Sequence, residues 1–469
     1  MLNTVLLSLR PGRCGGLLLA FLLMVPGVLC GQTAAVLAGS MPEDSLPELK
    51  AILQTAFKQS PASLQQSIYV AQAEAYRYYG DSALWPSLSG SASYSSYTAA
   101  TSGSDVTTTS KGLFYGISAS QPLYQWGALK AQADISRLGV KIAERQFADA
   151  YLHLAVTLRG QYLDLIARKV GLRNLRLQLK LAENDLATQE KNLTDGVISP
   201  GAIISPRLVV EEARLNLERT IQSFDYAKRV FTRLAGLDDL AEESIPVEIK
   251  LPSYQTATAE SLLSSFLRNG AENTVQGQIY VYSLKQSDLS YRIAKKRLYP
   301  KFSLGGGYYL SNSQAATGSV VAQSAIASYS TGITATWTLF DGFATRGAKL
   351  SALASKRSYE RQFQTYIDTS MDAAQNLRKQ VGFAARALNL AETRLALAKD
   401  GFKRIDEDYK LGTRSQVEVD VTMISLNYAE QTAISARAEY LNRWSEFVSL
   451  IGADPIASIL PARYLSHGK

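Results

Sequence analysis

The segment LFYGISASQPLY, residues 113–124, alternates residue by residue between two kinds of side chain. The odd-numbered positions of its first half are apolar: Leu113, Tyr115, Ile117 and Ala119. The even-numbered positions are mostly small: Phe114, Gly116, Ser118 and Ser120. A period of two predicts a β-strand. A soluble sandwich would usually carry charge on its outward face, so the absence of charge from both faces favours a strand in the wall of a membrane barrel.

Three further segments follow the same pattern. They are WPSLSGSASYSSY (85–97), PKFSLGGGYYL (300–310) and SYSTGITATWTLF (328–340). Each is about ten residues long, which is enough to cross a bilayer when the strand is tilted. The four segments predict two β-hairpins, 85–124 and 300–340, with a polar loop at 98–111. Tryptophans lie in or beside these strands, as membrane-interface residues or as ordinary packing residues: Trp85, Trp126 and Trp337.

The two hairpins belong to a duplication. Residues 116–236 align with 332–452 at a constant separation of 216, so that Gly196 meets Gly412 and Ser199 meets Ser415. Upstream of the first hairpin, Pro86 meets Pro300 at a separation of 214. We therefore expect two copies of one structural plan.

A long helical stretch follows each hairpin. Residues 128–195 contain no proline and would form a helix of about 100 Å. Apolar residues recur in steps of three and four, as in Leu172, Leu175 and Leu179, and the second copy repeats the spacing. This heptad-like seam predicts helices packed side by side over long distances. The resulting organisation is a first repeat over 39–236, a linker over 237–260, a second repeat over 261–452 and a tail over 453–469. We expect the linker to be irregular, with one short strand.

Each helical hairpin turns at a glycine. The tips lie near 196–205 and 410–416, where Gly196 and Gly412 can take the positive φ that ends a helix. Ser415 and Glu418 fit a capping box that starts the next helix. In the first copy, Ser199-Pro200 predicts a cap followed by proline at the first helical position.

The amino terminus has the order of a secretory signal peptide, predicted over 1–38. Arg10 and Arg13 precede the apolar run GLLLAFLLMVPGVL (16–29), and Val36-Leu37-Ala38 offers a cleavage site. A buried or anchoring helix is the alternative. Both cysteines, Cys14 and Cys30, precede the cleavage site, so the mature chain would have no disulfide. Cys30 could instead be lipidated, although Leu29 is bulkier than the usual preceding residue.

The composition excludes several classes of function. The 469 residues are 46% hydrophobic and 19% charged, which is typical of a globular chain, and the net charge of +8 is too modest to predict a nucleic-acid partner. His153 and His467 are the only histidines, and no P-loop, nucleophile elbow, zinc spacing or dinucleotide fingerprint is present. We therefore expect a non-enzyme without cofactor or metal.

Four strands cannot close a barrel, because about eight are needed. Open edges in lipid would leave unpaired backbone groups, so copies of the chain must pool their strands. Two chains give eight strands, filled by their own side chains. Three give twelve strands and a lumen lined by Ser, Thr and Gly, and this homotrimer is the assembly we expect.

Taken together, the duplication, the hairpins, the coiled-coil pairs and the motifs LYQWG (123–127), LFDGF (339–343) and YKLGTRS (409–415) resemble the TolC-like outer-membrane efflux family. The resemblance covers nearly the whole mature chain. It implies an α+β membrane protein in which a long coiled-coil helical barrel joins a 12-stranded trimeric β-barrel, to which each chain contributes four strands. It also implies an exit duct in the outer membrane that extends into the periplasm. Its partners would be a periplasmic adaptor and an inner-membrane pump of the RND, ABC or MFS type, in tripartite efflux or type I secretion.

The resemblance also assigns candidate site residues. Tyr409 and Arg414 match positions that hold the entrance shut in this family, and Glu418 with Asp420 would form the acidic constriction. By strict count the second acidic position falls on Val421. The first-copy acidic partner falls on Ala202, with Asp195 as a substitute. Exposure at the tips would make five residues adaptor contacts: Gly196, Ser199, Gly412, Thr413 and Ser415.

Two other classes remain open. An exported structural or adhesive coiled-coil protein would explain the heptads but not four uncharged alternating segments. A passive porin would explain the strands but would not need helices of this length. The cargo and the identity of the pump do not follow from the sequence.

Overall fold

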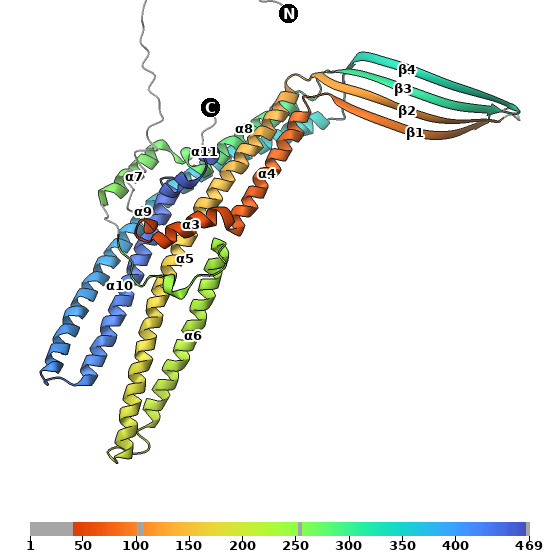
Figure 1. Ribbon diagram of the computed structural model, residues 1–469. Helices are drawn as coiled ribbons and strands as arrows, with labels where there is room; N and C mark the ends of the chain where they lie inside the picture. The colour runs from red at the N-terminus through yellow and green to blue at the C-terminus, as the bar shows by residue number, and fades with distance from the viewer. Residues whose placement is uncertain (1–40, 101–102, 104–106, 252–255, 466–469) are drawn as a thin grey trace, which may run out of the picture.

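In the computed structural model, an elongated helical body carries a curved sheet at one end (Figure 1). The structure describes residues 41–100, 103, 107–251 and 256–465. The predicted signal peptide (1–38), with Cys14 and Cys30, lies outside these residues. Among the described residues, no helix combines the length and the apolar character that crossing a membrane would require.

The two copies follow the same element order. The first contains α2 (Pro42–Ser45), α3 (Pro47–Gln59), α4 (Pro61–Ser82), β1 (Ser87–Ala100), β2 (Thr107–Tyr124), α5 (Ala128–Thr194) and α6 (Ile204–Ala235). The second contains α7 (Thr256–Asn269), α8 (Val275–Lys295), β3 (Lys301–Thr317), β4 (Val320–Thr336), α9 (Ala344–Lys410) and α10 (Gln416–Leu450). Short 3-10 helices lie at Glu242–Ser244, Ala271–Asn273 and Pro455–Ile459, and α11 (Ala462–Leu465) follows the last of them.

The duplication is visible in the lengths of the long helices. Both α5 and α9 contain 67 residues. They begin at Ala128 and Ala344, and they end at Thr194 and Lys410, so both boundaries keep the separation predicted from the sequence.

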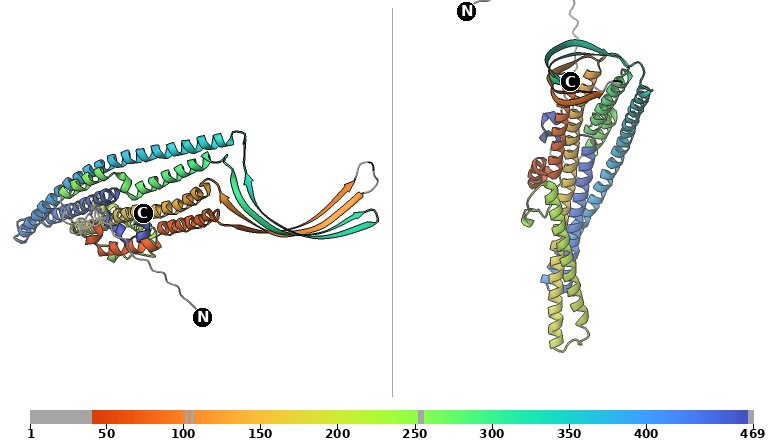
Figure 2. Two further views of the ribbon diagram at one scale, coloured as in Figure 1. Left: turned by 90° about the horizontal axis from the view of Figure 1, so that it is seen from above. Right: turned by 90° about the vertical axis from the view of Figure 1, so that its right-hand side faces the viewer.

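The sheet is a single antiparallel layer in the order β1-β2-β3-β4, so β1 and β4 form its edges. Figure 2 shows that the strands curve rather than lie flat. The four helices that connect to it, α4, α5, α8 and α9, run away from the sheet, and the tips of the α5–α6 and α9–α10 hairpins lie at the opposite end (Figure 1).

The strands are longer than predicted, with 14, 18, 17 and 17 residues. Much of the predicted 98–111 loop is paired instead: Thr98 lies opposite Thr109, and their hydroxyls are 3.1 Å apart. Because threonine is β-branched, such a run extends a strand. In the second hairpin, only Gly318, with φ 60°, and Ser319 separate the strands.

At the end of β4, by contrast, the strand is shorter than predicted. Residues 337–340 were predicted as strand, but pairing stops at Thr336 because its partner, Lys301, is the first residue of β3. Beyond that point the Trp337 indole N–H donates to the carbonyl of Leu298 at 3.1 Å.

The link between the copies contains no strand within its described part, 237–251, which corrects the predicted short strand. The last residues of the predicted linker already belong to α7. Ile245 and Ile249 are buried in the core, which explains the apolar residues that resembled a strand.

The main core surrounds the middle of α5, where α3, α6, α10 and the C-terminal segment meet. Tyr151, Tyr162 and Phe231 are essentially inaccessible there. Because α5 lies at the centre of this core, its packing sets the position of the helices that lead to the two hairpin tips.

Candidate functional site

The register of the sheet gives it two faces of different chemistry. Residues directly opposite one another in an antiparallel pair lie on the same face. One face therefore carries rows of small polar residues across the strands, for example Ser89, Ser118, Gly307 and Ser330. The hydroxyls of Ser89 and Ser118 are 2.9 Å apart. We refer to this surface as the serine face.

The opposite face is apolar. One of its rows contains Gly90, Ile117, Tyr308 and Tyr329. The rings of Tyr308 and Tyr329 lie 4.9 Å apart. Such a sheet suits a wall with lipid on one side and water on the other.

Charge is almost excluded from the strands. Their described residues include two charged side chains, Lys111 and Lys301, and both are basic. Lys301 starts β3 and lies on the serine face, at the end nearest the helices. Lys111 lies on the apolar face, toward the far end of β2.

Below the sheet, the predicted seam packs as expected. Leu172 and Val210 are buried in the first hairpin, and Ala391 and Leu395 are buried in the second. These residues hold each helix pair together over its length, and their function is structural.

Both hairpins end their first helix in the same way. Gly196 and Gly412 have φ values of 71° and 77°. In the first tip, the N–H groups of Gly196 and Val197 donate to the carbonyls of Leu193 and Asn192 at 3.1 and 2.8 Å. This is a Schellman motif, and it confirms the predicted glycine C-cap.

The second tip repeats the motif. The N–H groups of Gly412 and Thr413 donate to the carbonyls of Tyr409 and Asp408 at 2.9 and 3.0 Å. The Thr413 hydroxyl adds a further bond of 2.9 Å to the Asp408 carbonyl.

The tips differ in how the next helix starts. In the second tip Ser415 caps α10, and the predicted capping box is confirmed: the Glu418 carboxylate accepts from the Ser415 N–H at 2.9 Å. In the first tip the prediction was wrong, because α6 begins at Ile204 and Ser199 does not cap it. The position matching Glu418 is Ala202, which has no carboxylate to complete a box. The helix starts instead around the second Ser-Pro pair, where Pro206 lies in the first turn and lacks an N–H that would be unpaired in any case.

Among the predicted gate residues, Arg414 and Glu418 are in contact. The Arg414 Nη1 lies 2.8 Å from Glu418 Oε1, and its Nε lies 3.8 Å from Asp408 Oδ2. Arg414 therefore links the end of α9 to the start of α10.

The hydrogen bonds at this tip also change the pKa of Glu418. Donation from the Ser415 N–H, followed by the Arg414 guanidinium, holds the pKa of Glu418 below its ordinary value. The side chains of Arg414 and Glu418 are 45% and 44% exposed, so the pair is weak and easily broken.

The other two predicted gate residues lie nearby without joining this pair. Asp420 accepts from the Gln416 side-chain amide at 2.8 Å, one turn into α10. Tyr409 lies in the last turn of α9 with 40% of its surface exposed. Asp195 caps the end of α5 in the other tip, and Figure 1 shows the two tips apart from each other.

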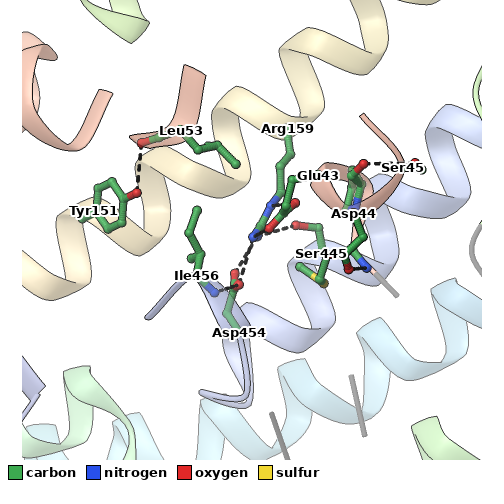
Figure 3. Close-up of polar contacts among 11 residues, drawn as sticks. Glu43, Asp44, Ser45, Leu53, Tyr151, Arg159, Ser445, Asp454 and Ile456 are labelled. Atoms are coloured by element: carbon green, nitrogen blue, oxygen red, sulfur yellow. Dashed lines mark hydrogen bonds and ion pairs between the residues drawn. The ribbon is translucent and has the colours of Figure 1, made fainter. Parts of the chain in front are cut away.

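A buried ionic cluster, which was not predicted from the sequence, surrounds Arg159 in the middle of α5 (Figure 3). Arg159 is 0% exposed and forms two-pronged ion pairs with Glu43 of α2 and with Asp454. Its Nη1 also donates to the Ser445 hydroxyl of α10 at 3.0 Å. Burial raises the pKa of Glu43, and Arg159 partly opposes that rise. A single arginine within the apolar run around Leu158 and Leu163 was the available signal.

Comparison with known proteins finds both a family and related structures. The sequence model described as outer membrane efflux protein matches residues 52–236 and 282–453. No curated protein matches the chain.

Solved structures of three outer membrane proteins share the fold, and two of them are described as outer membrane channels. CmeC of Campylobacter jejuni has 15% identity and a TM-score of 0.68, covering 86% of this chain and 85% of its own. VceC of Vibrio cholerae has 14% identity and a TM-score of 0.64, covering 88% and 98%. MtrE of Neisseria gonorrhoeae, solved in its open state, has 15% identity and a TM-score of 0.61, covering 87% and 89%.

Proposed function

The chain belongs to the outer membrane efflux protein family, and we propose that three copies of it form a continuous exit duct that is gated at the hairpin tips. Family membership makes the chain an outer-membrane transport channel. The trimer, the gate and the partners described below are our proposal.

The observation that carries the proposal is the two-faced sheet with two open edges. Four strands cannot close, and β1 and β4 each present an unpaired edge. Joining three sheets edge to edge would pair these backbone groups, turn the apolar faces toward lipid and surround a water-filled lumen with serine faces.

The helices support the same assembly. α9 carries large apolar side chains that the single chain leaves uncovered, including Leu350, Phe383 and Leu397, which are 59%, 60% and 67% exposed. A neighbouring copy would cover such a surface, since isolated monomers rarely expose large apolar patches.

The gate is proposed at the second tip. A guanidinium has five N–H donors, so Arg414 can hold Glu418 and also reach a group on an adjacent hairpin. Three-fold symmetry would place Glu418 and Asp420 in acidic rings around the entrance. Tyr409, next to the turn, would provide a further contact with the neighbouring hairpin. Opening would move the tip ends of α9 and α10 outward, while α5 and the part of α10 that packs against it stay fixed in the core.

The proposed partners dock at the tips. A periplasmic adaptor would dock on the surface around Gly196, Ser199, Gly412, Thr413 and Ser415, and an inner-membrane pump of the RND, ABC or MFS type would supply energy. The duct would serve tripartite efflux or type I secretion.

The test is conductance of the purified protein in planar lipid bilayers, with its mass measured in detergent. We expect a trimer with small conductance, and we expect R414A to raise the conductance because the proposed contact between the second tip and the adjacent hairpin is lost. R207A is the matched control, since Arg207 pairs with Glu190 at 3.1 Å across the first hairpin, and it should leave the conductance unchanged. A monomeric rod without conductance would overturn the duct, and equal effects of R414A and R207A would overturn the gate.

A further inference from the structure

A small basic cavity lies where the helices meet the sheet. Its volume is about 280 Å³, and its lining comes from the start of α5, from the end of α8 with the first residue of β3, and from Ala348 of α9. The lining includes three cations and two aromatic rings: Lys296, Arg297, Lys301, Trp126 and Tyr299. We refer to it as the junction niche.

The aromatic side of the niche is held in place by contacts between Trp126 of the first copy and the segment at the end of α8 in the second. The Trp126 indole N–H donates to the Pro300 carbonyl at 2.9 Å. The Lys296 ammonium donates to the Trp126 carbonyl at 2.6 Å. The Trp126 and Tyr299 rings meet edge to face at 5.3 Å. These contacts fix two ring surfaces and leave Lys296 with two further N–H donors.

The positive charge of the niche is poorly neutralised. Among the described residues, the one carboxylate within ion-pair reach of these cations belongs to Asp341, whose Oδ2 lies 4.0 Å from Arg297 Nε. That oxygen already accepts from the N–H and the hydroxyl of Thr345, at 2.9 and 2.6 Å. The Arg297 side chain is 54% exposed and can bind another anion.

The duplication shows that the fold does not need these cations. The turn from α4 into β1 matches the turn from α8 into β3, with Pro86 aligned to Pro300 and Trp85 to Tyr299. In the first copy, the three cation positions hold Ser82, Ala83 and Ser87. Because β1 begins at Ser87 as β3 begins at Lys301, a serine starts the strand equally well. The basic residues therefore have a role that is specific to the second copy.

The niche is connected to the serine face. Lys301 lies opposite Thr336, two residues before Ser303 in the alternation of β3, so it shares the serine face. If that face lines the lumen, as proposed above, three niches surround the passage at the inner mouth of the sheet.

We propose that the junction niche binds organic anions that carry an aromatic body, such as an aromatic sulfonate or carboxylate, as they pass through the duct. The three cations would hold the anionic group, and arginine in particular forms forked hydrogen bonds to carboxylate and related oxyanions. Trp126 and Tyr299 would contact the ring. This assignment deepens the proposed function, on which its role in transport rests, by naming a class of cargo.

Binding is tested by calorimetric titration of the purified protein in detergent with naphthalene-2-sulfonate. The variant R297A/K301S gives the second copy the residues of the first, so its fold should be preserved. We expect its Kd to rise at least about tenfold, the loss typical of a charge-assisted hydrogen bond. K111S removes the other strand lysine and should leave the Kd unchanged. K301R keeps the charge and should stay within about threefold of the parent protein.

Two further probes separate the contributions of charge and ring. Neutral 2-naphthalenemethanol should bind more weakly and should be insensitive to R297A/K301S. Inorganic phosphate should bind more weakly than the sulfonate, because it lacks the ring. Equal binding of the sulfonate to the parent protein and to R297A/K301S would overturn the niche, and equal binding of phosphate and sulfonate would overturn the role of the aromatic residues.

The bilayer measurement separates this inference from the duct. If the protein conducts but R297A/K301S does not change its affinity for the sulfonate, the proposed duct stands and the proposed anion site is wrong. If the protein does not conduct but R297A/K301S loses its affinity for the sulfonate, the anion site stands and its proposed role in transport is wrong.

Discussion

The two long helices, α5 and α9, have the same length and the same place in the duplicated plan, yet their surroundings differ. α5 crosses the centre of the core and is tied through Arg159 to α2, to α10 and to Asp454. α9 has Gln375 at the matching position, on an exposed surface. The comparison agrees with the proposed gate, in which the first copy is the fixed scaffold and the tip of the second copy moves.

The two hairpin tips also differ, in the polar contacts that close them. The first tip has neither the capping carboxylate nor the arginine, because Ala202 and Ile198 stand where Glu418 and Arg414 stand in the second. The second tip is closed by a capping box and an ion pair, both exposed to solvent. A tip closed by exposed polar contacts can open without loss of core packing.

The largest difference should appear at the matching positions on α5 and α9. R159M would leave Glu43 and Asp454 buried without a counter-charge, and we expect a loss of about 3–5 kcal/mol in unfolding free energy. Q375M should change stability by less than about 0.5 kcal/mol, since the site is exposed. Chemical denaturation of both variants, followed by circular dichroism, measures the contrast. Equal losses would remove the distinction between scaffold and moving part.

The two glycine caps should behave alike. G196A and G412A would each place a Cβ at positive φ, with no atom within 4 Å of it in either case. Only backbone strain then matters, and we expect about 1 kcal/mol of local stability to be lost at each tip. Hydrogen exchange of the amides at 193–197 and 409–413 measures this. Unequal losses would indicate that the Schellman motifs contribute differently.

The serines that follow should behave differently. S415A removes the cap of α10, and we expect a loss of about 1 kcal/mol in the first turn of that helix. S199A should have almost no effect on α6, which starts five residues later. Exchange rates at 416–420 and 204–208 report the two starts. Protection of α6 that depends on Ser199 would contradict the structure.

Acid should act on the second tip and leave the first unchanged. Because the folded-state pKa of Glu418 is lowered, the stability it contributes is complete above its unfolded pKa and is lost as pH falls through the folded value. The protection of the amides at 416–420, relative to the intrinsic exchange rate at each pH, should therefore decrease as pH falls below about 4. E418Q should show this lower protection at neutral pH, and its protection should no longer respond to acid in this range. A pH response retained in E418Q would assign the titration to another group.

The smallest effect is expected from making the first tip resemble the second. A202E supplies the missing carboxylate opposite Ser199, and we expect about 0.5 kcal/mol of added stability together with an earlier start of α6. Protection of the amides at 201–203 measures it, with A202Q as the control for side-chain size. If A202E leaves these amides unprotected, Pro200 or Gly201 prevents the box.

The sequence could predict whatever depended on periodicity and on the repeat. The ends of α5 and α9, the glycine caps and the Ser415 box follow from local residues, and the structure agrees with them. Strand length was not predictable from hydrophobicity, because the Thr-rich ends of β1 and β2 pair through their backbones regardless of polarity. The start of α6 was mispredicted because Ser199-Pro200 does not suffice as a cap on its own. A capping box also needs a carboxylate or amide three residues later, and Ala202 has neither.

The Arg159 cluster could not be assembled from sequence, because its members are far apart in the chain and only the fold brings them together. The run KKRLYPK (295–301) was visible, but its meaning depended on knowing that Trp126, from the other copy, faces it.

The equal lengths of α5 and α9 have a consequence for how such a chain can change over generations. At 67 residues each, the two helices span about 100 Å, and this distance is encoded twice in one gene. An insertion in one helix alone would change the reach of one tip and leave the other unchanged, so a longer or shorter version requires matched changes in both copies. The repeat thus couples the lengths of the two helices. In natural variants, α5 and α9 should be longer or shorter by the same number of residues, in whole heptads.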